Sequence, residues 1–190
     1  MFLERLKVTP KNAVLIIIVI MGFLIFILIN QLVFTPLGNM VSTYGILNFE
    51  FAFSKEQVLN IFSAWGTQGI ALEVLGVYWD FLYIIGYLSL IFGSILLVLR
   101  QSDVKLQKIG YWGLLTPVLA GIFDIIENVN LLLMLNLTPT FPAFIPLITS
   151  ISALLKFGFL IIAIAFFCII LVIFIIQKIK KKRSFKKKIN

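Results

Sequence analysis

One apolar stretch, residues 121–135, contains three side chains that could do chemistry. Its sequence is GIFDIIENVNLLLML, and Asp124, Glu127 and Asn128 are separated by three and four positions. That spacing places all three side chains on one face of a helix. Ionisable residues are costly in hydrocarbon, so such residues usually face the interior of a helix bundle and have a partner there. The pattern therefore predicts a buried polar cluster inside a membrane.

Two other apolar segments supply candidate partners. Asp80 lies within residues 73–99, and Lys156 is the only charge within residues 147–176. At about 1.5 Å per helical residue, the four charges come to lie roughly 8 to 18 Å below the same membrane surface. Glu73 is expected at that surface, where it needs no partner. We predict one ligand-binding cluster, formed by Asp80, Tyr83, Tyr87, Asp124, Glu127, Asn128 and Lys156.

The composition is that of a membrane protein. The chain has 190 residues, of which 61% are hydrophobic, and a net charge of +8. Histidine is absent, which removes the commonest metal ligand and the commonest general base near neutral pH. Cys168 is the only cysteine, so no disulfide can form within the chain. We therefore expect no metal site, no cofactor and no nucleic-acid partner.

The apolar runs predict an all-α fold, a four-helix transmembrane bundle forming a single domain. About 20 apolar residues are enough to cross the hydrocarbon. Pro117 should kink the third span, and the Thr35-Pro-Leu-Gly38 sequence should end the first one. The predicted spans are residues 13–34, 73–99, 111–137 and 147–176, followed by a basic tail at 177–190.

The connection between the first two spans carries two further patterns. Residues 49–53 alternate phenylalanine with other residues, which is a short strand-like pattern. Residues 54–57 read as a capping box that opens an amphipathic helix, on which Val58, Phe62 and Trp65 share a face. This helix either lies at the extracytoplasmic membrane surface with Trp65 as an anchor, or packs on the ends of the spans.

The distribution of charge predicts the orientation. The N-terminal segment, residues 100–108 and the tail are basic, whereas residues 35–72 and 138–146 carry little positive charge. Basic loops favour the cytoplasmic side. We expect a multi-pass protein of the plasma membrane with both termini in the cytoplasm and the cluster in the outer half of the bilayer. The tail is expected to contact anionic lipid.

Three segments together resemble a family of small, uncharacterised four-span integral membrane proteins of prokaryotes. They are FEFAFSKEQVLNIFSAWG at 49–66, YWDFLYIIGY at 78–87 and GIFDIIENVNLLL at 121–133, with Lys156 in the last span. The intramembrane Asp-x-x-Glu-Asn motif is the most specific part of the resemblance. The resemblance covers residues 30–160 and implies a fold and a topology, but no activity.

The cluster leads to one main functional hypothesis and three alternatives. The main hypothesis is binding of a small polar or amphiphilic ligand, or a lipid, in a pocket that opens outward. An acid–base enzyme acting on a lipid would use Glu127 or Asp124 as proton donor and Lys156 as stabiliser. A structural protein would use Lys156 to bridge Asp124 or Glu127, unless Lys156 extends to the membrane surface. Transport of protons or cations would require a dimer, so a homo-oligomer stays open.

Overall fold

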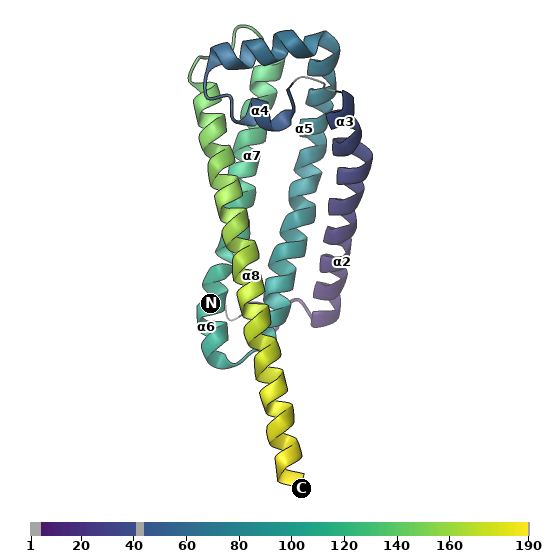
Figure 1. The fold of residues 1–190 in the computed structure, drawn as a ribbon, viewed down its shortest axis with the longest axis vertical. Helices are drawn as coiled ribbons and strands as arrows, with labels where there is room; N and C mark the ends of the chain where they lie inside the picture. Colours follow the sequence, from purple (N-terminus) through teal and green to yellow (C-terminus); the bar gives the residue numbers. More distant parts are fainter. Residues whose placement is uncertain (1–4, 41–43, 190) are drawn as a thin grey trace.

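The chain folds into a bundle of four long helices that lie side by side (Figure 1). The computed structural model describes residues 5–40 and 44–189, and the side chains of these residues except 39, 40, 109 and 183–189. No strand occurs in the described ranges, so the predicted all-α class is confirmed. The elements are α2 (Asn12–Ile29), η1 (Asn30–Phe34), α3 (Thr35–Met40), α4 (Ile46–Glu50), α5 (Lys55–Arg100), α6 (Val104–Gly113), α7 (Leu115–Asn136) and α8 (Ile145–Ile189).

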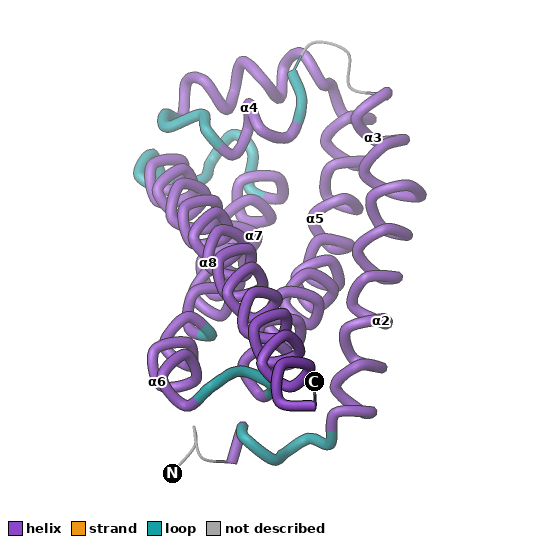
Figure 2. Tube along the Cα trace, turned by 60° about the horizontal axis from the view of Figure 1, so that its bottom comes forward, coloured by secondary structure: helices purple, strands orange, loops and turns teal. Residues whose placement is uncertain are grey.

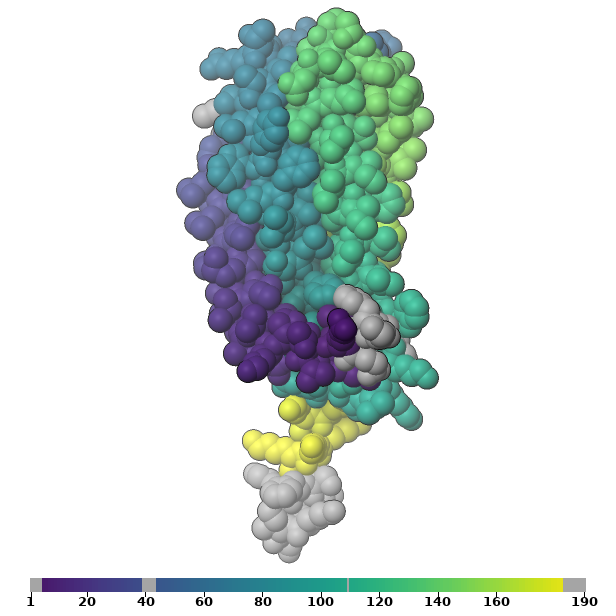
Figure 3. Space-filling model, turned by 180° about the vertical axis from the view of Figure 1, so that it is seen from behind, coloured from purple at the N-terminus to yellow at the C-terminus, as the bar shows by residue number. Residues whose placement is uncertain are grey.

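In the described part of the chain, four helical stretches are long and apolar enough to cross a membrane, as expected of a multi-pass membrane protein. They pack in the order α2, α5, α7 and α8, and Figure 3 shows them as neighbouring bands on one face of the molecule. Glycine allows α2 and α5 to lie close together, because a Cβ atom on Gly22 would lie 2.7 Å from the carbonyl oxygen of Gly86. The candidate spans are Asn12–Gly38, Lys55–Arg100, Val104–Asn136 and Ile145–Lys182.

The first span does not end at Thr35, so that prediction was wrong. The amide of Thr35 bonds to the carbonyl of Asn30, five residues earlier, and forms the wide turn η1. Pro36 has no N–H group and its ring would clash with a carbonyl in a regular helix. The wider turn immediately before Pro36 relieves this conflict, so the helix continues as α3 to Met40.

Helix α5 contains a sharp corner at Gly66. Ser54 caps its start by accepting a hydrogen bond from the amide of Gln57 at 3.2 Å, as the capping pattern predicted. Gly66 has φ 65° and ψ −177°, a conformation that suits glycine. The part of α5 before Gly66 lies across one end of the bundle, and the part after it runs along the bundle (Figure 1).

The predicted amphipathic helix is therefore the first part of α5, and it packs on the ends of the spans. Val58, Phe62 and Trp65 are all buried. The indole Nε1 of Trp65 donates to the carbonyl oxygen of Tyr44 at 2.7 Å. Trp65 thus belongs to the protein core and does not act as a membrane anchor.

The strand-like pattern at residues 49–53 was misread, because residues 46–50 form the short helix α4. Phe49 is buried against the rings of Phe62 and Trp65, with centroids 5.1 and 5.4 Å away in edge-on geometry. Phe51 stacks on Phe157 of α8 at 5.9 Å. These aromatic contacts pack α4 and the residues that follow it onto α5 and α8, and no strand pairing occurs in this described segment.

The third span is interrupted close to Pro117, as its sequence predicted. The helix is interrupted at Leu114, three residues before Pro117, and the hydroxyl of Thr116 donates to the Gly113 carbonyl at 2.7 Å. That carbonyl is the one that Pro117 cannot bond. Helix α8 continues through the basic tail to Ile189 and projects beyond the bundle (Figure 1), and Figure 2 shows it with its C-terminal end turned toward the viewer. The basic side chains from residue 183 onward lie outside the described part of the chain.

Candidate functional site

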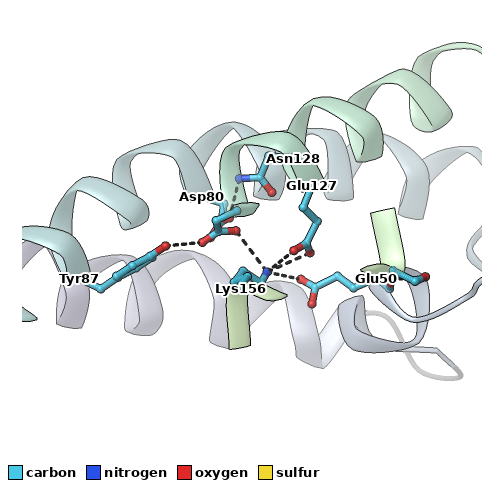
Figure 4. A network of polar contacts seen from close by, with 8 residues as sticks. Glu50, Asp80, Tyr87, Glu127, Asn128 and Lys156 are labelled. Atoms are coloured by element: carbon cyan, nitrogen blue, oxygen red, sulfur yellow. Dashed lines mark hydrogen bonds and ion pairs between the residues drawn. The ribbon is translucent and has the colours of Figure 1, made fainter. Parts of the chain in front are cut away.

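Lys156 of α8 is the centre of the polar cluster. It is 5% exposed, so it does not extend to the membrane surface. Its Nζ lies 2.8 Å from Oε2 of Glu127, 3.2 Å from Oδ1 of Asp124 and 3.5 Å from Oε1 of Glu50. Figure 4 shows the carboxyl groups of Glu127 and Glu50 both next to the end of the Lys156 side chain. Asp124 and Glu127, one helical turn apart on α7, meet Lys156 as their spacing predicted.

Glu50 is the member of the cluster that sequence reasoning missed. Helix α4 inserts it into the bundle, where its carbonyl accepts a hydrogen bond from the hydroxyl of Ser150 at 2.7 Å. The same hydroxyl accepts the amide of Phe53 at 3.0 Å. The available signal was a single acid between two phenylalanines, Phe49 and Phe51, which is unusual for a solvated loop. The strand interpretation obscured that signal.

Glu50 is held in an environment that disfavours its charge. Burial raises the pKa of the Glu50 carboxyl, and the ammonium group of Lys156 opposes this only in part. Its Oε2 atom is buried and receives no hydrogen bond in the described structure. The Oε1 atom of Glu50 contacts Lys156, so Oε2 is the acceptor position of Glu50 that is left without a hydrogen bond.

Two hydrogen bonds connect α5 with α7 beside Lys156. The hydroxyl of Tyr87 donates to Oδ2 of Asp124 at 2.8 Å. The amide of Asn128 donates to Oδ2 of Asp80 at 2.7 Å. Asp124 thus joins Tyr87 to Lys156, whereas Asp80 bonds to an asparagine and forms no ion pair within the described residues.

Tyr83 lies at the edge of the cluster. Its hydroxyl accepts a hydrogen bond from the side-chain amide of Asn30 at 3.1 Å, and its ring stacks on Phe26 at 5.1 Å. Asn30 begins the wide turn η1, so the same distortion that accommodates Pro36 also places this amide beside α5. Tyr83 therefore links the first span to the site and does not contact the charged groups of the centre.

Glu73 is buried, which corrects the expectation that it lies at the membrane surface. It is 5% exposed and lines the pocket described below. The physical reason is the corner at Gly66, which turns the chain into the bundle seven residues before Glu73. The overlying segments 46–65 then cover this part of α5. No ion pair or hydrogen bond joins Glu73 to another described residue.

A pocket of about 310 Å³ opens beside the cluster. This volume is at the lower end of the range for small-molecule sites. Glu127 is fully buried behind the wall and does not reach the pocket. One side of the wall is polar, made by Glu50, Glu73, Asp80, Tyr83, Tyr87, Asp124, Asn128 and Lys156. The other side is apolar and includes Phe34, Leu37, Val77, Leu131, Phe157 and Leu160.

The donor set does not suit a metal ion. Within the described residues, no group of three or more acidic, histidine or cysteine side chains is arranged to hold one. The ammonium group of Lys156 lies where a cation would neutralise Glu50, Asp124 and Glu127. The arrangement can bind polar groups, hold protons and stabilise charge.

Comparisons with protein families, with curated proteins and with solved structures found no match for this chain. The resemblance to small prokaryotic four-span proteins therefore stays a prediction from the sequence. The function has to be argued from the pocket and its charges.

Proposed function

We propose that this chain is a membrane-embedded binding protein for a small amphiphilic molecule or a lipid. The observation that carries the proposal is the pocket of about 310 Å³ with one polar and one apolar side. A ligand with a polar end and an apolar body matches both sides at once. The polar end would contact the pocket-lining members of the cluster, and the body would contact Phe34, Leu37 and Leu160.

The packing of the helices supports access from the bilayer. Helix α2 packs mainly against α5, and α8 packs mainly against α7, with no extensive contact between α2 and α8 in the described chain. Both helix pairs contribute to the apolar side of the pocket wall: Leu37 comes from α3, which continues from α2, and Leu160 comes from α8. An apolar molecule dissolved in the membrane could therefore reach the pocket from the side, between α2 and α8.

The proposed location is the plasma membrane, with both termini in the cytoplasm. The end of the bundle at which α4 lies is opposite the end from which α8 projects (Figure 1). Lys178, Lys180, Lys181 and Lys182 on that projection are exposed. Positive charge favours the cytoplasmic side and can contact anionic lipid there. The pocket would then lie in the outer half of the membrane.

A second candidate is a structural role for the cluster, supported by the close ion pair between Lys156 and the fully buried Glu127. Buried ion pairs can select one arrangement of helices without adding much stability. A structural role needs no pocket, however, and does not account for the free side of the polar wall.

Of the two acids on α7, Asp124 alone lines the pocket, so acid–base chemistry on a bound lipid would fall to Asp124.

The test compares two tryptophan substitutions in full-length protein purified in mild detergent. Leu160→Trp fills the pocket, whereas Ile161→Trp places the same side chain on an exposed position of α8. Native mass spectrometry and lipid extraction measure what co-purifies. We expect a bound small molecule with the native chain and with Ile161→Trp, and its loss with Leu160→Trp. Equal occupancy in all three proteins would contradict the proposal.

A further inference from the structure

The pocket has far more acid than base. Four of its lining residues are acidic, namely Glu50, Glu73, Asp80 and Asp124, and Lys156 is the one basic residue among them. Lys156 is already engaged by Glu127, Asp124 and Glu50. The acids on the α5 side of the pocket, Glu73 and Asp80, therefore have no cation of their own in the described structure.

Two of these acids have unused acceptor atoms. Glu73 is 5% exposed, lines the pocket and has no hydrogen-bond or ion-pair partner among the described residues. Glu50 is 8% exposed, and its Oε2 atom receives no hydrogen bond. A buried carboxyl group without a partner is unfavourable unless it keeps a proton or meets a cation. The pocket thus has a place for a positive group.

The three lining acids other than Asp124 approach the pocket from two elements. Glu73 and Asp80 are seven residues apart on α5, which places them nearly on one face of that helix. Glu50 comes from α4, which lies beneath the first part of α5 at this end of the bundle (Figure 1). A group bound among them would be surrounded by carboxyl oxygens and would find the apolar side of the wall, with Phe34 and Leu37, next to it.

We infer that the polar end of the ligand is an ammonium group, carried on an apolar body and bound by Glu50, Glu73 and Asp80. This inference rests on the proposed binding function. A primary or secondary ammonium group fits best, because its N–H donors satisfy the unused carboxyl oxygens, which a quaternary ammonium group cannot do. An anionic headgroup would be repelled by the acid excess. A neutral headgroup would leave the acids without a counter-charge.

The experiment uses three probes with the same ten-carbon chain: decylamine, decanol and decanoate. Full-length protein in dodecyl maltoside is titrated with each probe, and adducts are counted by native mass spectrometry. We expect decylamine to bind at least tenfold more tightly than decanol, and decanoate not to bind. Leu160→Trp should abolish decylamine binding, which separates the pocket from unspecific association with the micelle.

Isosteric variants then test the acids. Glu73→Gln and Asp80→Asn should each weaken decylamine binding at least tenfold and leave decanol binding within twofold of the native value. Glu56→Gln removes an exposed acid of α5 that does not line the pocket, and should change neither. Elution from gel filtration and the unfolding temperature without probe show whether each variant is folded. A folded Glu73→Gln, Asp80→Asn double variant that binds decylamine normally would overturn the inference.

The outcomes separate the two proposals. Equal affinity for decylamine and decanol, both lost in Leu160→Trp, would refute the cation preference and leave the binding function standing. Preferential binding of decanoate would also refute it and would point to Lys156 as the headgroup site. Binding of every probe that is insensitive to Leu160→Trp would refute both the inference and the proposed function.

Discussion

Replacement of Lys156 by methionine tests the physical basis of the cluster most directly. Methionine keeps much of the side-chain length and removes the ammonium group. Three carboxyl groups within 3.5 Å of Nζ then lose their counter-charge. Breaking a buried ion pair by removing one partner costs about 3–5 kcal/mol. Because Lys156 serves three acids, we expect Lys156→Met to lower the free energy of unfolding by about 4–5 kcal/mol at pH 8.

The loss should be smaller at pH 5, because burial raises the pKa of Glu50 and a protonated Glu50 no longer repels the neighbouring carboxyl groups. The double variant Lys156→Met with Glu127→Gln should be more stable than the sum of the single changes, by about 1–3 kcal/mol. The assay is reversible unfolding in mixed micelles of dodecyl maltoside and sodium dodecyl sulfate, followed by far-ultraviolet circular dichroism. Lys105→Met, on an exposed position of α6, is the matched control and should change little.

Two results would refute this reasoning. A Lys156→Met protein that unfolds within about 0.5 kcal/mol of the native chain at pH 8 would have the stability change of an exposed ion pair. Strict additivity in the double variant would show that Lys156 and Glu127 do not interact energetically, despite the 2.8 Å contact.

Three further changes probe other parts of the site. Because burial raises the pKa of Glu50, the folded chain holds this proton more tightly than the unfolded chain, so stability falls as pH rises above 4.5. Glu50→Gln should remove part of this fall in stability, measured by unfolding at a series of pH values, and an unchanged pH profile would contradict the prediction. The charged groups that face Glu50 are Lys156 on α8, Asp124 and Glu127 on α7, and Glu73 and Asp80 on α5. Gly66→Ala should cost about 1–3 kcal/mol through backbone strain alone, since no atom lies within 4 Å of the added methyl, whereas Gly158→Ala, equally open but helical, should be neutral or stabilising in the same assay. Tyr87→Phe should cost about 1–3 kcal/mol by leaving a buried carboxylate without its donor, while Tyr78→Phe at a 58% exposed position should stay within about 0.5 kcal/mol.

Most of the bundle was predictable because the signals are local. Apolar length marks the four spans, and the missing N–H of Pro117 marks the interruption of the third. The spacing of Asp124, Glu127 and Asn128 placed them on the inner face of α7, where all three are buried. Depth counted along the helices also brought Lys156 to two of these groups, because a helix advances by a constant rise per residue.

The errors concern segments whose conformation depends on distant contacts. Residues 35–38 continue the helix because η1 accommodates Pro36, and residues 46–50 are helical because aromatic side chains pack them onto α5. Glu73 is buried because the chain turns into the bundle at Gly66 and because residues 46–65 then cover this part of α5. A charged residue near the end of a span looks the same in sequence whether or not another segment lies over it.

By itself, the sequence determined that the chain forms four apolar helices with acids and one lysine at similar depth, because helical periodicity and apolar length are properties of neighbouring residues. Only the tertiary structure decided that Glu50 completes the site, that Glu73 faces a pocket and that Lys156 meets three carboxyl groups. The position of Glu50 depends on a hydrogen bond from Ser150, 100 residues away in the chain. Contacts between residues so far apart arise from the packing of the whole bundle, and no local pattern in the sequence specifies them.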